Sequence, residues 1–177
     1  MSDAKPLGPT ADLIARYDRG GRLLVAAVDA VDDDRARQRI GPGTWSLSEL
    51  VAHLVDSDLV GIERMKRVIA EENPTLQAYD ENAWIARLGS IDEPMAEMAA
   101  LFAANRRAMA RVLARCTPSD FARVGRHTED GPKSLAKLLA GYVGHLDGHL
   151  RFLYGKRGAL GLGIVPRYAR EEAGQSG

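Results

Sequence analysis

The sequence predicts an all-α protein folded as a four-helix bundle. Apolar residues recur at spacings of three and four along four long segments, which is the period of helices with one buried face. No segment has the strict alternation of apolar and polar residues that is typical of a half-buried strand. The chain has 177 residues, 45% of them hydrophobic and 27% charged, which fits a single globular domain. Four amphipathic helices in one domain favour a bundle.

Composition excludes several functional classes. The 24 basic residues are balanced by 24 acidic ones, so no net charge favours nucleic acid. No apolar run approaches the roughly 20 residues of a membrane span, and the first residues lack the apolar core of a secretory signal. Cys116 is the single cysteine, so an intrachain disulfide is impossible. These features predict a cytoplasmic protein without a nucleic-acid or membrane partner. Separately, we expect its substrate to be a small molecule.

The first helix is predicted over residues 10–31. Its inner stripe consists of Leu13, Ile14, Tyr17, Leu24, Val28 and Val31. Gly20 and Gly21 interrupt the pattern, which indicates a kink or a close contact with another helix. Three aspartates follow at 32–34. We interpret them as a solvated loop, with a metal site as the alternative, because glycine and proline break the chain again at 41–43.

The second helix is predicted over residues 46–72. Ser46 and Glu49 have the spacing of a capping box, and the Asn-Pro pair at 73–74 stops the helix. The connection that follows has about 20 residues and includes a short helix or ordered loop at 79–88. A connection of this length between the second and third helices is long for a bundle, and we expect it to cover a site.

The third helix is predicted over residues 92–116, with Pro94 in its first turn. A single turn should follow from Thr117. Residues 123–133 are polar and contain two glycines and a proline, so they are predicted to form a loop. The last helix should cover residues 134–155. We therefore divide the chain into a bundle, 1–157, and a glycine-rich, charged tail, 158–177.

The histidines are the main candidates for a metal site. His145 and His149 are four residues apart, so they share one face of the last helix, one turn from each other. His53 lies at the border of the second helix's apolar stripe. One such histidine is most often a core residue with a satisfied hydrogen bond. Three that converge would suffice for Zn²⁺ or a similar divalent ion and would leave a coordination position open.

Other residues are candidates for roles around this site. Asp56 lies three residues after His53, on the same side of the helix, and is a candidate general base; the alternative is a solvated surface carboxylate. A basic pocket rim would favour an anionic cofactor. The candidates for lining the pocket are Arg64, Tyr79, Glu81 and His127.

Three segments together resemble the DinB/YfiT-like superfamily. Residues 44–57, TWSLSELVAHLVDS, are similar to its W-S-x-x-E-x-x-x-H-L-x-D-S segment. Residues 79–84, YDENAW, resemble its Y-D-E-x-x-W stretch. Residues 126–149, from Arg-His to the paired histidines, are similar to its ending, although Ser134 replaces a common threonine. The resemblance covers about residues 13–153.

The resemblance implies a four-helix bundle whose helices are not arranged in sequence order. It also implies one divalent metal ion held by His53, His145 and His149, with zinc or nickel ahead of iron or manganese. Members of the superfamily include S-transferases and isomerases that use low-molecular-weight thiols, and proteins described as metal-dependent hydrolases. Many members are homodimers, so we expect a homodimer here.

The function predicted at this point is metal-dependent, and its reaction is left open. Three neutral histidines can hold a metal that activates water for hydrolysis, or one that binds a thiol as thiolate for S-transfer. The resemblance favours thiol-dependent S-transfer. Hydrolysis and a non-catalytic metal-binding bundle are the alternatives, and a haem-binding or partner-binding bundle is a weaker one. Since an ordinary histidine titrates near pH 6.5, metal affinity is expected to fall below about that pH.

Overall fold

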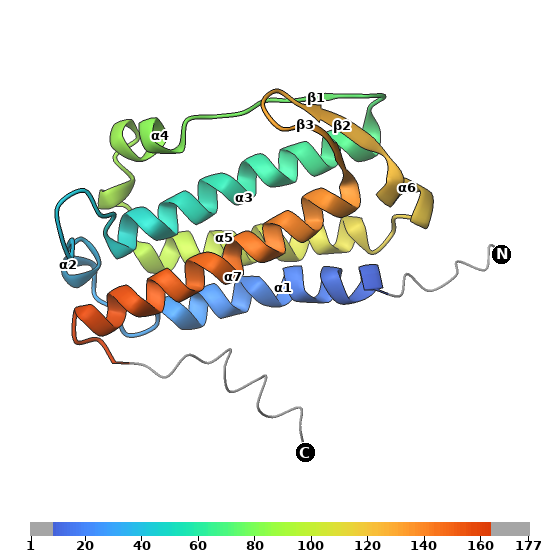
Figure 1. The fold of residues 1–177 in the computed structure, drawn as a ribbon. Coiled ribbons are helices and arrows are strands. Elements are labelled where there is room, and N and C mark those ends of the chain that lie inside the picture. Colours follow the sequence, from blue (N-terminus) through green and yellow to red (C-terminus); the bar gives the residue numbers. More distant parts are fainter. Residues whose placement is uncertain (1–8, 164–177) are drawn as a thin grey trace, which may run out of the picture.

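Four long helices form the bundle in the computed structural model, which describes residues 9–163 (Figure 1). They are α1 (Pro9–Val28), α3 (Leu47–Ala70), α5 (Met95–Leu113) and α7 (Leu135–Ala159). Their contacts form a ring in the order α1, α5, α3, α7 and back to α1. The first and second long helices therefore face each other across a diagonal. The predicted all-α bundle is confirmed, and its helices follow a non-sequential order.

The ends of the long helices differ from the predictions by a few residues. Pro94 is the residue before α5 rather than part of its first turn. Helix α7 continues four residues past the predicted end because Arg157 is buried there and donates hydrogen bonds to the carbonyls of Ala27 and Asp29 at the end of α1. The predicted tail, 158–177, is described as far as Gly163, and residues 164–177 lie outside the described residues.

The predicted capping box at the start of α3 is confirmed. Ser46 accepts a hydrogen bond from the Glu49 amide at 3.1 Å, and Glu49 accepts one from the Ser46 amide at 2.7 Å. Arg39 also donates to both carboxylate oxygens of Glu49, which holds the pKa of Glu49 below its usual value despite burial. The start of the helix that carries His53 is thereby fixed from two sides.

Asp32 and Asp33, two of the three aspartates at 32–34, accept hydrogen bonds from amides at helix starts. The predicted loop is a four-residue helix, α2 (Asp33–Ala36), and the Asp32 carboxylate accepts from the Arg35 amide at 2.9 Å. Asp33 accepts from the amide of Met95 at 3.3 Å, at the start of α5. Both carboxylates therefore satisfy backbone N–H groups at helix starts.

The connection between α3 and α5 runs along α3 above the bundle, and it contains β1 (Thr75–Leu76), α4 (Glu81–Arg87) and the 3₁₀ turn η1 (Ser90–Asp92) (Figure 1). It is the covering connection that its length predicted. The later predicted turn is α6 (Pro118–Ala122), capped by Thr117. Helix α4 is short, and Asp80 caps it by accepting from the Ala83 amide.

The prediction of a loop at 123–133 is wrong, because most of these residues belong to a β-hairpin. Strands β2 (Val124–His127) and β3 (Gly131–Ser134) pair antiparallel, and β1 adds to β2 in parallel. Buried and exposed residues alternate in β2, but the buried ones are Gly125 and His127. Neither is a large apolar residue, so the alternation cannot be recognised in the sequence. Gly125 is needed because a side chain there would meet Leu76 and Val68 at 2.9 Å. The hairpin thus fixes the covering connection to the bundle.

A buried polar layer divides the apolar core into two clusters. At its centre, the Arg106 guanidinium donates to Asp58 at 2.9 Å and to the carbonyl of Tyr142 at 2.9 Å. The Tyr17 hydroxyl also donates to Asp58, and the guanidinium stacks 4.4 Å from the Tyr17 ring. Burial raises the pKa of Asp58, which the nearby Arg106 charge opposes. This layer joins α1, α3, α5 and α7 in the middle of the bundle.

Gly20 and Gly21 mark a close contact, and α1 continues through both residues. A Cβ on Gly21 would lie 2.7 Å from the Ala103 Cα of α5. Gly21→Ala is therefore expected to lower the free energy of unfolding by about 1–3 kcal/mol. Gly144→Ala is the matched control, since a Cβ there meets nothing within 4 Å and should stabilise α7 by about 0.5–1 kcal/mol. Urea denaturation of both variants measures the difference, and equal effects would contradict the packing argument.

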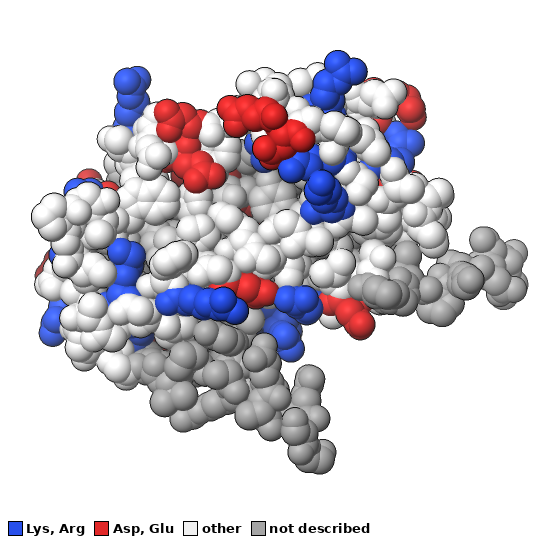
Figure 2. Space-filling view, viewed as in Figure 1, with Lys and Arg blue, Asp and Glu red and all other residues white. Residues whose placement is uncertain are grey.

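Charged side chains gather along α4 and the β2–β3 hairpin, which cross above the bundle, whereas much of the face beneath them is uncharged (Figure 2). Within residues 9–163, none of the helices combines the length and the apolar character that crossing a membrane requires.

Candidate metal centre

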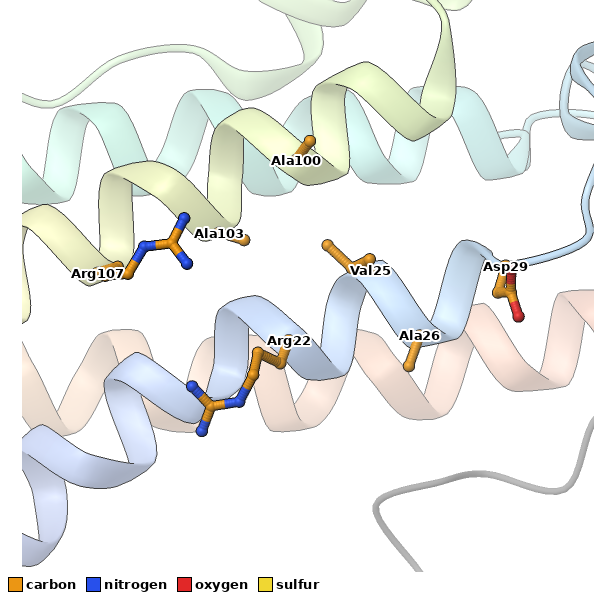
Figure 3. Close-up of a pocket in the computed structure, with 7 residues that line it drawn as sticks. All are labelled: Arg22, Val25, Ala26, Asp29, Ala100, Ala103 and Arg107. Atoms are coloured by element: carbon orange, nitrogen blue, oxygen red, sulfur yellow. The ribbon is translucent and has the colours of Figure 1, made fainter.

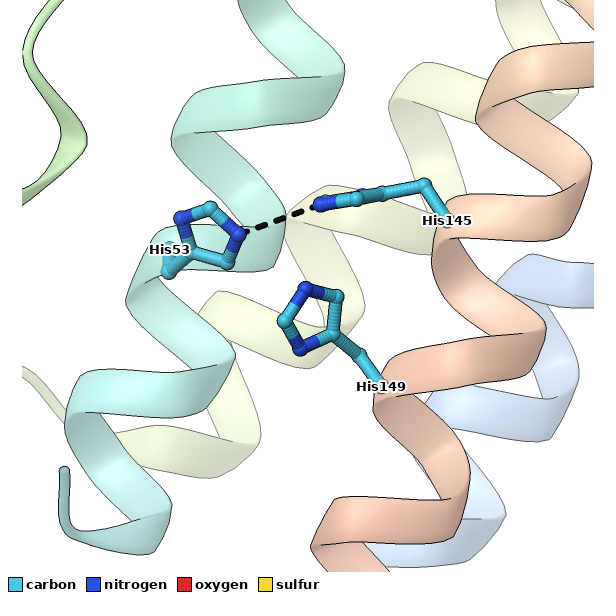
Figure 4. Close-up of side chains that lie close together, drawn as sticks. All are labelled: His53, His145 and His149. Carbon is cyan, nitrogen blue, oxygen red and sulfur yellow. Dashed lines mark hydrogen bonds between the residues drawn. The ribbon is translucent and has the colours of Figure 1, made fainter. Parts of the chain in front are cut away.

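Three histidines from two neighbouring helices meet on one side of the bundle (Figure 4). His53 comes from α3, and His145 and His149 come from successive turns of α7. The Nε2 atoms of His53 and His145 are 3.1 Å apart, and one ligand atom from each of the three rings lies within 4.8 Å of the others. His53 is 2% exposed, and the other two rings are partly buried. The structure therefore brings together the three histidines that the sequence singled out.

The three rings are held in their neutral form. Burial lowers the pKa of His53 and His149, and it lowers the pKa of His145 to about 3, with further lowering from the other two imidazoles. Neutral imidazole is the form that binds a metal ion. The Nδ1 atom of His149 is buried and has no hydrogen-bond partner among the described residues. The cluster therefore offers ring nitrogens as metal ligands, and at least one of them has no hydrogen bond within the described residues.

The ring of His53 is oriented by two neighbours. The Trp45 ring packs on it with centroids 4.9 Å apart, and a Glu81 carboxylate oxygen lies 3.8 Å from its Nδ1 atom. Nε2 of the same ring faces His145. A carboxylate beside the outer nitrogen of a histidine favours the tautomer with its proton on that side, which leaves Nε2 free as a ligand. Helix α4 supplies this carboxylate from the covering connection.

Asp56 was the predicted catalytic carboxylate next to His53. It is partly buried, and burial raises its pKa. Within the described part of the chain, the carboxylate that comes close to His53 is that of Glu81, and no ion pair joins Asp56 to the ring. A side chain three residues along α3 shares the side of the helix with His53 without reaching its nitrogen atoms.

Two cavities open on either side of the histidines. The first, here called the aromatic chamber, has a volume of about 340 Å³ and includes His149 in its wall. Its other lining residues are Gly43, Thr44, Trp45, Leu50, Asn82, Phe152 and Lys156. The second, the cationic chamber, has about 300 Å³ and includes His145. It is lined also by Ser57, Arg64, Glu81, His127, Asp130, Lys133, Lys137, Leu138, Gly141 and Tyr142.

Three of the four residues predicted to line the pocket do line one of these chambers, and the fourth lies outside both. Arg64, Glu81 and His127 line the cationic chamber. Tyr79 lines neither chamber; its ring packs on Trp84 at 4.6 Å, and burial raises its pKa to about 12.

Sequence reasoning missed several lining residues. Tyr142 and Phe152 had a signal, because each lies three residues from a histidine of α7 on the same helical face. Lys133 and Lys137 had none, since their position depends on how the hairpin meets α7.

A larger cavity of about 470 Å³ lies between α1 and α5 (Figure 3). It is lined by Arg22, Val25, Ala26, Asp29, Ala100, Ala103 and Arg107. It belongs to the edge of the bundle opposite the α3–α7 edge that holds the histidines, and among residues 9–163 no histidine or cysteine lines it. Although this cavity is larger than the two chambers, the described residues of its lining offer no histidine or cysteine ligand for a metal ion.

Comparison with known proteins identifies the family. Residues 16–153 match the DinB superfamily. A protein of Oceanobacillus iheyensis named "putative metal-dependent hydrolase" is 30% identical over 129 residues, 73% of this chain and 74% of that protein. A protein of Bacillus mycoides with the same description is 26% identical over 122 residues, 69% and 70% of the two chains. The structure of YfiT from Bacillus subtilis, described as "a probable metal-dependent hydrolase with an unusual four-helix bundle topology", matches with a TM-score of 0.82 at 23% identity over 91% of this chain and 93% of that one. The chain belongs to the DinB superfamily.

Proposed function

We propose that this protein is a metal-dependent hydrolase whose single divalent ion is held by His53, His145 and His149. The observation that carries the proposal is the convergence of three neutral imidazoles from α3 and α7 between two open chambers. The names of the relatives support the same class of reaction.

The donor set fits zinc. At a Zn–N distance of about 2.0–2.1 Å, two nitrogen ligands in tetrahedral geometry are roughly 3.3 Å apart. The Nε2 atoms of His53 and His145 are 3.1 Å apart in the structure. Three imidazoles without a carboxylate ligand favour zinc or nickel over manganese, and iron is the alternative among imidazole-binding metals. Three protein ligands also leave a position open for a substrate.

In this proposal, water is activated at the metal ion, Glu81 and Trp45 orient His53, and Asp56 accepts a proton. The metal, when bound, would act as a Lewis acid and lower the pKa of a water molecule toward 7. The Glu81 carboxylate, 3.8 Å from Nδ1 of His53, favours the tautomer that carries its proton on that side, and the Trp45 ring packs on the same imidazole. Asp56 stays the predicted proton acceptor, and burial raises the pKa of its carboxyl group, which makes the carboxylate a stronger base than an exposed aspartate.

Thiol-dependent S-transfer is the second candidate. It is favoured by the presence of two chambers with different linings on either side of the histidines, since a transfer reaction needs room for two reactants. A low-molecular-weight thiol and an electrophile would then occupy one chamber each. The three histidines are required equally by both reactions.

The test compares products with and without thiol. Zinc-loaded protein is incubated with a panel of esters, amides and alkyl halides, with and without low-molecular-weight thiols, and the products are identified by mass spectrometry. Hydrolysis without thiol, abolished by chelator and by His53→Ala, supports the main proposal. A product that carries the thiol supports S-transfer instead. Turnover that is unchanged by chelator would contradict both, because neither proceeds without the metal.

Glu81→Gln tests the orienting carboxylate. We expect zinc affinity to fall about tenfold, because the amide keeps the size of the side chain and removes its charge beside His53. Glu97→Gln, an exposed site on α5, is the matched control and should leave the affinity unchanged. Competition with a zinc-binding dye measures both variants. Equal affinities in the two variants would show that His53 is oriented without Glu81.

The homodimer remains a prediction that rests on the family. Multi-angle light scattering at micromolar concentration should give twice the mass of the 19.2 kDa chain. A monomer under these conditions would contradict it.

A further inference from the structure

Arg64 is the most unusual residue of the cationic chamber. Its side chain is 9% exposed. It donates one hydrogen bond to the Tyr142 hydroxyl at 3.1 Å and another to the carbonyl of Gln77. Both acceptors are neutral, and the buried Nε has no partner among the described residues. A guanidinium taken out of water without an opposite charge is costly, so an anion that met it would stabilise the site.

Two carboxylates also line this chamber, and neither forms an ion pair with Arg64 or Lys137 among residues 9–163. Asp130 forms an ion pair with Lys133 at 3.0 Å, and Glu81 faces His53. Lys137, on the first turn of α7, makes no ion pair with any residue between 9 and 163. Arg64 and Lys137 therefore line the same chamber as His145 without an ion pair of their own among these residues. The Asp130 carboxylate is bound by Lys133, which lowers its pKa, and the Arg64 charge also lowers that pKa. A divalent ion on the histidines would add positive charge at that wall.

The aromatic chamber has a different character. Trp45, Leu50 and Phe152 give it an apolar wall. The cation in its lining, Lys156, donates a hydrogen bond to the carbonyl of Trp45. The two sides of the histidine cluster thus differ in their lining, because Lys156 is the cation among the described residues that line the aromatic chamber, whereas Arg64, Lys133 and Lys137 line the cationic chamber on the His145 side.

We infer that the substrate carries an anionic group, a carboxylate or a phosphate, and that Arg64 and Lys137 hold this group in the cationic chamber while the reacting bond lies at the histidines. The inference rests on the proposed function and names the substrate class of the same site. A planar guanidinium matches two oxygens of either anion, whereas the lysine acts as a point charge at the rim. A neutral substrate of equal shape would leave the buried guanidinium uncompensated.

The test uses two metal-binding probes that differ in one charge. Zinc-loaded protein is titrated by calorimetry with 4-carboxybenzohydroxamate and with its neutral counterpart, 4-methylbenzohydroxamate. Hydroxamate chelates zinc whichever reaction the protein performs, so binding of the neutral probe reports on the metal alone. The anionic probe is expected to bind about tenfold more tightly, because its carboxylate gains charge-assisted hydrogen bonds.

Three variants locate the effect. Lys137→Gln, at an exposed position, should reduce the preference for the anionic probe about threefold. Arg64→Gln should abolish it, with circular dichroism to establish that the variant is folded, because Arg64 also supports Gln77 and Tyr142. Lys66→Gln on the exposed face of α3 is the matched control and should leave the preference unchanged. Because the Lys137 side chain is exposed and makes no ion pair with the described residues, its variant keeps the test decisive if Arg64→Gln does not fold.

The outcomes separate this inference from the proposed function. Equal affinity for the two probes, or a preference that Lys137→Gln leaves intact, would overturn the anion site while the metal centre stands. Binding of neither probe would count against an accessible metal. In that case, inorganic phosphate is titrated into the metal-free protein: binding weakened by Lys137→Gln and not by Lys66→Gln supports the anion site, and no binding overturns it.

Discussion

His145→Ala is expected to abolish stoichiometric zinc binding while the bundle stays folded. Loss of one of three ligands leaves two imidazoles, His53 on α3 and His149 on α7, and two ligands hold zinc far more weakly than three. The ring of His145 is partly exposed and lies at the wall of a chamber, so its removal leaves the two apolar clusters of the core in place. Elemental analysis after dialysis should give about one zinc per chain for the wild type and much less for the variant.

The matched control is His127→Ala, which removes a histidine of the cationic chamber outside the cluster of three. Nδ1 of His127 accepts from the amides of Glu129 and Asp130 at 3.3 and 3.2 Å, so the ring serves the turn of the hairpin. This variant should keep its zinc. Full retention of zinc by His145→Ala, with circular dichroism unchanged, would remove the basis for the three-histidine site.

The metal-free protein is expected to lose stability between pH 7 and pH 5 because of His145. Burial lowers the pKa of this histidine to about 3 in the folded protein, whereas in the unfolded chain it titrates near 6.5. Below pH 6.5 the unfolded chain therefore binds a proton that the folded protein does not, and unfolding is favoured as the pH falls. Well above pH 6.5 this histidine is neutral in both states and does not affect stability, whereas by pH 5 it alone lowers the free energy of unfolding by about 2 kcal/mol.

His145→Gln isolates this contribution, since the amide does not titrate and the other groups are shared. Urea denaturation with chelator, at pH 7 and pH 5, should give a difference between wild type and variant that narrows or reverses by about 2 kcal/mol at the lower pH. Asp56 and Asp58, whose pKa values burial raises, have the opposite sign, and the subtraction cancels them. A pH-independent difference would contradict a buried neutral His145.

The same burial corrects the expected pH dependence of metal binding. With three ordinary imidazoles, protonation at pH 5.5 would weaken zinc binding about a thousandfold. Because the pKa values of all three histidines are lowered in the folded protein, protons compete with the metal only at lower pH. Zinc affinity of the folded protein should therefore fall far less than a thousandfold between pH 7.5 and 5.5. Between pH 7.5 and 5.5, the histidines therefore change the stability of the metal-free protein more than they change the zinc affinity of the folded protein.

Most of the helical architecture could be predicted from the sequence because it is local. The apolar period located the four long helices, and the capping box of Ser46 and Glu49 fixed the start of α3 to the residue. The end of α7 could not be predicted in this way, since Arg157 prolongs the helix through bonds to α1. The β2–β3 hairpin was missed for a related reason: the buried positions of β2 are Gly125 and His127, and Gly125 is buried by Leu76 and Val68 from other elements.

The residues of the candidate site can likewise be separated into those whose proximity follows from local helix geometry and those brought together by the packing of helices. The sequence by itself determined that His145 and His149 share a face, because residues four apart in a helix are always neighbours. Only the tertiary structure decided that His53 meets them, because α3 adjoins α7 in the ring of helices. It also placed Glu81 beside His53, where the sequence had suggested Asp56, and it brought Arg64 and Lys137 into one chamber. Spacing along one helix follows from hydrogen bonds between near neighbours, whereas contacts between helices follow from how their apolar faces pack across the whole chain.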